Sequence, residues 1–194
     1  MTDQPAYLDP PLSNSTITLR PWTIRDLSAV EQASHDPYIL ATTSVPAVYS
    51  DEAGRAWIAR QERHAAARPG VVLCITDAAT DQPLGLIALW LENKAHGRAS
   101  FGYWVIPEAR GRGTATEAVR LLGAWAFSAL SIARLEILVK PHNVASQRVA
   151  EHAGFQREGL LRSYEEFHGR RLDLIMHSLL ATERSTHDDA ATHG

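Results

Sequence analysis

The sequence RGRGTA, which begins at Arg110, places two arginines and two glycines directly before a stretch with helical periodicity. Gly111 and Gly113 allow the backbone to curl closely around a ligand, and the amides from Arg112 to Thr116 are expected to point outward at the start of the helix. These amides, the positive end of the helix dipole and the two arginine charges would suit a phosphate or pyrophosphate. The alternative is a plain soluble turn between a strand and a helix.

This turn does not match two better-known nucleotide-binding loops. No Gly-Lys-Ser/Thr sequence follows it, which excludes a P-loop. The third glycine of the GxGxxG fingerprint is missing, and the strand before the turn is expected to lie in an antiparallel meander rather than in a βαβ unit. The motif by itself therefore remains a weak signal for any particular ligand.

A second group of residues with acid–base chemistry lies in SYEEFHG, residues 163–169. Glu165 and Glu166 point to opposite faces if the segment is extended, so only one of the two can face a cleft. His168 could contact a substrate or act as a second base. The plainer interpretation is a solvated acidic loop for the glutamates and a turn residue for the histidine.

Composition excludes several classes of function. The chain has 194 residues, of which 45% are hydrophobic, a formal net charge of −3 and a pI near 6.3. This length fits one domain with a proper core, and the lack of a basic excess argues against nucleic acid as a partner. The nine histidines show no HExxH or paired ligand spacing, so we expect no metal site. Cys74, the only cysteine, lies in the apolar run VVLCI and is expected to be a buried thiol rather than a nucleophile.

The sequence predicts neither export nor membrane insertion. The first sixteen residues lack the basic start and apolar core of a signal peptide, and the run LGLIALWL is too short to cross a bilayer. We therefore expect a cytoplasmic protein without a membrane partner. Residues 1–15 are expected to be a flexible extension, and the polar residues 182–194 a disordered tail.

The apolar pattern predicts the elements that must position these residues. Strands are expected at 17–21, 71–77, 84–92 and 99–106, with the last three as antiparallel neighbours, a helix at 24–34 behind the capping box of Thr23 and Asp26, a loop at 35–50, and a long helix from Ser50 to Pro69. A helix then begins at Thr114, followed by a strand at 134–140, a helix at 144–154, and two last strands joined through SYEEFHG. The order implies at least one parallel crossover, so the class is α+β with a mixed sheet.

Several motifs in one order resemble the GNAT superfamily of N-acetyltransferases. A strand ending in Val-x-Pro is followed by Arg-x-x-Gly-x-Ala at the start of a helix, by a strand, and by Asn-x-x-Ser at the start of a second helix that ends in Gly-Phe. In this chain the motif residues are Val105 and Pro107, Arg110, Gly113 and Ala115, Asn143 and Ser146, and Gly154 and Phe155. The resemblance covers roughly residues 16–181, and the set of motifs is far more specific than any one of them.

Within that superfamily the chain looks most like the Rim-type (RimJ/RimL-like) branch, which acetylates protein N-termini and also includes many proteins with small-molecule substrates. The segments that carry this likeness are HDPYI, NVASQRVAEHAGF and SYEEFHGRRLDLIMHSLL. The resemblance implies a GNAT domain over residues 16–181, with a mixed, mostly antiparallel sheet, a splayed strand pair and flanking helices. It also implies acetyl-CoA as cosubstrate and an amine acceptor, and because Rim-type relatives are often dimers, a homodimer is a further expectation.

The resemblance assigns roles to individual residues. A backbone N–H near Val105 would bind the acetyl carbonyl oxygen, Ser146 would protonate the leaving thiolate, and Glu165 would take the proton of the amine through a water. Taken alone, Ser146 could equally be a first-turn helix serine bonded to its own backbone. The implied cofactor-binding residues are Val105, Arg110, Gly111, Arg112, Gly113, Thr114, Ala115, Thr116 and Asn143, of which Asn143 is also the expected N-cap of its helix.

The acceptor is left open. The resemblance places the acceptor pocket around Tyr38, Val45 and Tyr49, whose identities specify little about the amine, while the tryptophans are expected to fill the core or a cleft wall. The favoured interpretation is direct acetyl transfer to a protein N-terminal amine or a small amine, without a covalent enzyme intermediate. The rivals are a catalytically silent acyl-CoA-binding regulatory module, which would keep the phosphate turn but not need Ser146 or Glu165, and a plain α+β interaction domain.

Overall fold

The computed structural model describes residues 10–67, 69–167 and 169–183, with only the backbone for 62–67. Most of the extension expected at 1–15, most of the tail expected at 182–194, and His168 lie outside these residues. The chain divides into two compact units, of which the first runs to Trp90 and continues over Gly102–Leu122, and the second comprises Leu91–Phe101 and the chain from Gly123.

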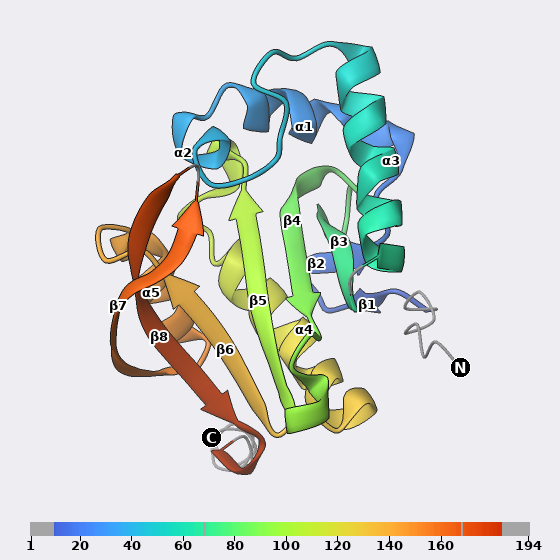
Figure 1. Ribbon diagram of the computed structural model, residues 1–194. Helices are drawn as coiled ribbons and strands as arrows, with labels where there is room; N and C mark the ends of the chain where they lie inside the picture. Colours follow the sequence, from blue (N-terminus) through green and yellow to red (C-terminus); the bar gives the residue numbers. More distant parts are fainter. Residues whose placement is uncertain (1–9, 68, 168, 184–194) are drawn as a thin grey trace. The chain divides into compact units, whose positions relative to one another are not determined.

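The first unit contains most of the helices and an antiparallel set of strands (Figure 1). Its elements in chain order are β1 (Leu12–Ser13), β2 (Ile17–Arg20), the 3₁₀ turn η1 (Ile24–Asp26), α1 (Leu27–Ser34), α2 (Pro37–Leu40), α3 (Asp51–Ala67), β3 (Gly70–Asp77), β4 (Pro83–Trp90), the second half of β5 (Arg98–Val105), the 3₁₀ turn η3 (Pro107–Ala109) and the first half of α4 (Thr114–Leu130). The strands follow one another in the order β1-β2-β3-β4-β5, and the pairs from β1 to β4 are antiparallel.

Side-chain caps explain where the helices of this unit begin. Thr23 and Asp26 form the expected capping box, with the Asp26 carboxylate accepting the Thr23 backbone N–H at 2.7 Å. The Ser50 hydroxyl accepts the N–H of Ala53 at 3.1 Å and so opens α3 as expected. The segment expected as a loop at 35–50 also contains α2, which was missed because four residues leave no periodic pattern.

One face of β3 and β4 packs against α1 and α3 around a cluster of tryptophans. The rings of Trp22, Trp57 and Trp104 have centroids between 5.0 and 6.2 Å apart. Cys74 is fully buried in the same core, and burial raises the pKa of its thiol well above the usual value. The thiol therefore stays protonated and inert, which confirms the expectation of a buried structural cysteine.

The second unit contains the parallel pair of strands and the C-terminal hairpin. Its elements are the 3₁₀ turn η2 (Lys94–His96), the first half of β5, the second half of α4, β6 (Arg134–Val139), α5 (Val144–His152), β7 (Gln156–Phe167), β8 (Arg170–Leu180) and the 3₁₀ turn η4 (Ala181–Glu183). The strand order is β5-β6-β8-β7, where β5 and β6 are parallel and the other pairs antiparallel. The expected α+β class with a mixed, mostly antiparallel sheet is confirmed, including the parallel crossover through α4.

Two details of the strands bear on the site. The parallel register of β5 and β6 covers Arg98–Phe101 with Arg134–Ile137 and ends there, which is where the expected splaying of this pair would begin. The sequence predicts a connection at SYEEFHG, whereas β7 continues to Phe167 and resumes its pairing with β8 at Glu165, opposite Leu172. No helix in the described part of either unit is long and apolar enough to span a membrane.

Candidate functional site

The turn before α4 has the backbone geometry that its sequence predicts. Gly111 and Gly113 have φ values of 72° and 80°, which L side chains rarely adopt. A Cβ built on either glycine would meet nothing within 4 Å, so the space on that side of the turn is open. The N–H groups of Thr114, Ala115 and Thr116 begin α4, where the first turn of a helix has no intrahelical acceptors. The turn therefore presents backbone donors and a helix dipole beside open space, which suits an anion.

The two arginines of the turn differ in their surroundings. The Arg110 guanidinium donates from Nη2 to Asp36 Oδ2 at 2.7 Å and from Nε to the carbonyl oxygen of Val105 at 3.1 Å. Arg112 is exposed and forms no ion pair within the described residues. In this arrangement the charge of Arg110 is already compensated, so Arg112 is the better placed of the two to meet a phosphate. Direct phosphate binding by either arginine stays a prediction.

Asp36 is a residue of this region that the sequence analysis missed. It is buried, and its Oδ1 caps α2 by accepting the N–H groups of Tyr38 and Ile39, each at 2.9 Å. Burial raises the pKa of this carboxyl, but the N–H of Ile39 and the Arg110 guanidinium outweigh burial and lower the pKa overall. An Asp-Pro pair signals a helix start, but nothing in the sequence identifies a partner 74 positions away.

The end of β5 is held in a close backbone contact with β4. The N–H of Ile106 donates to the carbonyl oxygen of Leu84 at 2.9 Å. A Cβ at Gly85 would collide with the carbonyl oxygen of Trp104 and would lie 2.9 Å from the Cα of Val105. Only glycine allows this approach, and an isolated glycine inside the strand LGLIALW was the signal that could have revealed it.

In the second unit, α5 begins as its sequence predicts. The side-chain oxygen of Asn143 accepts the backbone N–H of Ser146 at 3.0 Å, which confirms Asn143 as the N-cap. Ser146 is half-buried in the first turn of the helix. The cap fixes the position of the serine relative to the end of β6, but the role of Ser146 as a proton donor stays a prediction.

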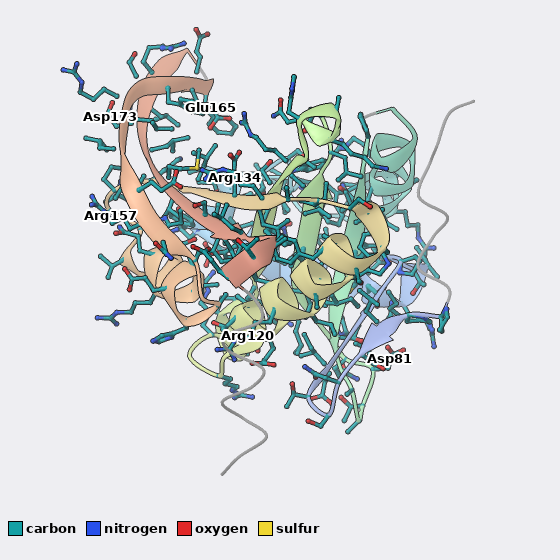
Figure 2. All side chains as sticks on the ribbon, turned by 90° about the horizontal axis from the view of Figure 1, so that it is seen from below. Asp81, Arg120, Arg134, Arg157, Glu165 and Asp173 are labelled. Atoms are coloured by element: carbon teal, nitrogen blue, oxygen red, sulfur yellow. The ribbon has the colours of Figure 1, made fainter. Side chains whose placement is uncertain are left out.

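Glu165 and Glu166 lie in β7 near the closed end of the β7–β8 hairpin, and both are exposed. Figure 2 labels Glu165 in this hairpin. Glu165 shares a strand face with Phe167, because alternate residues of a strand point to the same side. The Phe167 ring lies under the ammonium of Lys140, 5.6 Å from the ring centroid, just after β6. Glu166 points to the other face, so the two glutamates are separated as expected.

A bulge in β7 lies directly before Glu165. Leu161 pairs with Leu174 and Glu165 with Leu172, so three residues of β7 oppose the single residue Asp173. Ser163, in the middle of the bulge, has a φ of 52° and donates its N–H to Asp173 Oδ1 at 2.7 Å.

Arg171 completes this bulge from β8. It donates to the Ser163 hydroxyl at 3.0 Å and also to the Ser163 carbonyl oxygen. The polar groups of Ser163 are thus satisfied within the hairpin, and the alternation of side chains restarts after it with Glu165.

Further along the same sheet, a charged cluster joins β6 to β7. Arg134 donates to Glu136 at 2.7 Å and to both carboxylate oxygens of Glu158 at 2.7 Å (Figure 2). The Ser178 hydroxyl donates to Glu158 at 2.6 Å. Arg134 first and Ser178 second lower the pKa of Glu158 to about 2. The charged groups of this cluster are bonded to one another, so we interpret it as a structural network rather than a reactive site.

A model of the acetyltransferase (GNAT) domain family matches residues 16–156. The chain belongs to this family. The N-acetyltransferase p20 of Bacillus licheniformis is 38% identical over 104 residues, which are 54% of this chain and 58% of p20. The N-acetyltransferase YoaA of Bacillus subtilis is 29% identical over 169 residues, 87% of this chain and 82% of YoaA. The spermidine N(1)-acetyltransferase of Escherichia coli is 29% identical over 106 residues, 52% of this chain and 57% of that enzyme.

Solved structures agree with the family. RimJ of Mycobacterium smegmatis, solved in complex with CoA-disulfide, superposes with a TM-score of 0.71 at 25% identity and covers 86% of this chain and 83% of RimJ. The GNAT fold and the likeness to the Rim-type branch are therefore confirmed. The chain spans little more than half the length of several of these curated relatives, and it belongs to a family of acetyltransferases that use acetyl-CoA as cosubstrate.

Proposed function

We propose that the GNAT protein transfers the acetyl group of acetyl-CoA directly to a primary amine. The observation that carries the proposal is the turn at Gly111 and Gly113, whose positive φ values and open side leave the first amides of α4 available to a pyrophosphate. Two left-handed glycines two positions apart, directly before the first turn of a long helix, support binding of an anion at this turn. We assign the pyrophosphate to residues 111–116 and the neighbouring positive charge to Arg112.

The acetyl end of the cosubstrate is assigned to the end of β5. A backbone N–H near Val105 would bind the carbonyl oxygen of the thioester, whose negative charge grows as the amine attacks. The support for this assignment is the fixed backbone there, since Gly85 lets β4 approach and Leu84 holds the N–H of Ile106. Asn143, at the start of α5, is assigned to the pantetheine arm.

The reaction needs one base and one acid. The amine must lose a proton before its lone pair attacks the carbonyl carbon, and Glu165 is assigned as the base that takes this proton through a water. The C–S bond then breaks, and Ser146 is assigned to donate its hydroxyl proton to the departing thiolate. The serine regains a proton from the positively charged nitrogen of the former amine, so that a neutral amide and CoA are the products. Support for Glu165 comes from its exposed position on β7, fixed by the bulge at Ser163.

The acceptor is a protein N-terminal amine or a small amine. The similarity to RimJ favours the first, and the similarity to a spermidine acetyltransferase favours the second. We also propose that the domain extends to residue 181, because β8 pairs with β6 as far as Leu180. The homodimer expected from the resemblance stays a prediction, which light scattering of the full chain would test.

The experiment has a binding step and a turnover step. Thermal unfolding is first measured with acetyl-CoA, succinyl-CoA and free CoA, and all three should raise the Tm because they share the pyrophosphate. The protein is then incubated with acetyl-CoA and either a peptide library or an amine library, and acetylated products are identified by mass spectrometry. Absence of any Tm shift would contradict the assigned turn, and binding without products from either library would point to the silent regulatory module.

A further inference from the structure

A chain of hydrogen bonds in the first unit connects the end of β5 to α2. Its central residue is Arg110, which bonds to the Val105 carbonyl oxygen at 3.1 Å and to Asp36 at 2.7 Å. The guanidinium is planar and its N–H donors point in fixed directions, so the two contacts hold Val105 and Asp36 at a set separation.

The peptide between Val105 and Ile106 is held from both sides. Its carbonyl oxygen accepts from Arg110, and its N–H donates to Leu84 at 2.9 Å. Rotation of this peptide would break both bonds, so the backbone direction at the end of β5 is fixed before any ligand binds. The proposed reaction needs a fixed backbone donor next to this peptide, and errors of about 1 Å in such geometry lower rates strongly.

Asp36 uses its two carboxylate oxygens for two different tasks. Oδ1 caps α2 through the N–H groups of Tyr38 and Ile39, while Oδ2 accepts from Arg110. Only 7% of the residue is exposed, so few alternative conformations are open to it. The carboxylate therefore ties the start of α2 to Arg110, and through Arg110 to Val105.

The hydrogen bonds continue from α2 along residues 37–44, which contain Tyr38 and lead to Val45, two of the residues expected at the acceptor pocket. The Thr43 hydroxyl donates to the carbonyl oxygen of Ile39 at 2.8 Å, and Arg60 of α3 donates to that of Ser44 at 2.8 Å. Residues 37–44 are thus held at one end by Asp36 and at the other by α3. A shift of Asp36 would move this segment and the end of β5 together.

We propose that Asp36 and Arg110 are positioning residues that couple the acceptor segment 37–44 to the acetyl-binding end of β5. This inference rests on the proposed acetyl transfer. Replacing Asp36 leaves the amides of the glycine turn and Arg112 unchanged, so acetyl-CoA still binds. It misaligns the acetyl group and the amine, so kcat falls by about 10-fold while the Kd of acetyl-CoA changes by less than about 2-fold.

The decisive variant is Asp36→Asn, because it separates the two tasks of the side chain. Its amide oxygen still caps α2, since asparagine is a good N-cap, but its NH₂ group cannot accept from Arg110. Asp26→Asn is the matched control in the same unit. Asp26 is also a buried capping carboxylate, bonded to Thr23 and to Arg20 by two contacts of 2.8 Å. Asp26→Asn should lower the Tm and leave kcat and acetyl-CoA affinity near wild type.

Two further variants test whether the residues act as one link. Arg110→Gln breaks the pair from its more exposed side, and it replaces Asp36→Asn if that variant does not fold. Arg110→Lys keeps a cation for Asp36 without the fixed fork, so its kcat should lie between those of wild type and Arg110→Gln. The double variant Asp36→Asn/Arg110→Gln should match the single variants within about 3-fold, whereas losses that multiply would overturn the coupling.

The readouts separate this inference from the proposed function. A loss of kcat at unchanged acetyl-CoA affinity in Asp36→Asn, but not in Asp26→Asn, supports positioning; a wild-type kcat, or equal losses in both variants, overturns it. Amide hydrogen exchange of Ile106 in the full chain needs no turnover. Exchange should be faster in Asp36→Asn than in Asp26→Asn, and equal protection would overturn the inference. Failure of the proposed function would show separately, as a wild type that acetylates neither library.

Discussion

The turn at 110–113 and the bulge at 162–164 both depart from regular backbone, but they are completed in different ways. The turn uses Gly111 and Gly113 and leaves the space beside both glycines open. The bulge has Ser163 at a φ of 52°, and the side chains of Asp173 and Arg171 in β8 form hydrogen bonds with its backbone N–H and its hydroxyl. The first amides of α4 have no acceptor within the helix, which suits an anion, whereas the polar groups of Ser163 are bonded within the hairpin, two residues before Glu165.

This difference suggests a division of labour. A loop that keeps its donors available is suited to binding, and a loop that satisfies its own donors is suited to holding a side chain still. Changes at the turn should therefore act on acetyl-CoA affinity, and changes at or after the bulge on kcat. Each prediction below tests one side of that division.

The largest effect is expected at Glu165. Glu165→Gln keeps the shape of the side chain and removes its basicity, so kcat should fall by roughly 10²-fold while acetyl-CoA affinity stays near wild type. The deficit should shrink at high pH, where the amine is neutral without a base. Steady-state rates from pH 6 to about pH 10, with the Kd measured in parallel, check both points.

The neighbouring glutamate provides the control for this variant. Glu166→Gln removes the same charge from the opposite face of β7 and should keep most of the activity. Full activity of Glu165→Gln across the pH range would show that Glu165 is not the base. Glu166 or His168 would then become the next candidate.

The second effect should appear in binding alone. Gly113→Glu places a carboxylate in the open space beside the turn, so the stabilisation by acetyl-CoA should disappear; for a wild type at 100 times its Kd this stabilisation is about 2.7 kcal/mol. Gly154→Glu is the matched control, because Gly154 also has a positive φ of 92° and open space around its Cβ position. Both variants should lose about 1–2 kcal/mol to backbone strain, but only Gly113→Glu should lose the ligand response. Unchanged affinity in Gly113→Glu would place the cosubstrate elsewhere.

The two regions also differ in how far the sequence predicts them. The turn can be predicted from RGRGTA because the residues themselves determine its properties: glycine permits positive φ values and arginine supplies positive charge. The φ values of 72° and 80° agree with that prediction. The bulge is not visible, because its cause is the partnership of Ser163 with Asp173 and Arg171 across a hairpin. For the same reason the sequence predicts a connection at SYEEFHG where the structure has a strand.

The other missed residue, Asp36, follows the same rule. Its cap on α2 is local and could be read from Asp-Pro, but its ion pair with Arg110 joins segments 74 positions apart. Helix starts at Thr23, Ser50 and Asn143 were predicted correctly because each depends on residues within one turn. Periodicity and motifs could not predict the side-chain pairs between residues that are far apart in the sequence.

A third effect, of about 10-fold in kcat, is expected for Ser146→Ala. A missing thiolate donor slows departure of the leaving group whatever the protonation state of the amine. Its deficit should therefore persist at high pH, in contrast to that of Glu165→Gln. A Ser146→Ala deficit that vanishes at high pH would show that the serine acts on the amine side. Wild-type rates at all pH values would leave it as a first-turn helix serine.

A smaller effect is expected from loosening the bulge itself. Asp173→Ala removes the acceptor of the Ser163 N–H, so Glu165 should lose orientation and kcat should fall by about 3- to 10-fold at unchanged acetyl-CoA affinity. Asp173→Asn keeps an acceptor oxygen and should recover most of the activity. If both variants lose only stability and keep kcat, the bulge does not position the base.

The smallest effect, on stability rather than rate, is expected at Glu158, which lies on the same strand before the bulge. Its folded pKa of about 2 is below the ordinary 4.5, so its pairing with Arg134 stabilises the protein above about pH 4.5, and this contribution is lost as the pH falls toward 2. Because 44% of the Glu158 side chain is exposed, Glu158→Gln should cost less than about 1 kcal/mol at pH 7.

Thermal unfolding of wild type and Glu158→Gln between pH 7 and about pH 2.5 measures this contribution, and the two Tm values should converge at the acidic end. Glu151→Gln, which changes an exposed glutamate on α5, should show no comparable convergence. A Tm difference between wild type and Glu158→Gln that grows on acidification would contradict the lowered pKa of Glu158.

The same variant also tests whether a change elsewhere in β7 affects the proposed base, Glu165. The bulge at Ser163 interrupts the pairing of β7 with β8 at a point between Glu158 and Glu165. The kcat of Glu158→Gln should therefore equal that of wild type at pH 7. A loss of kcat as large as that of Asp173→Ala would mean that the whole strand, and not the bulge alone, positions the base.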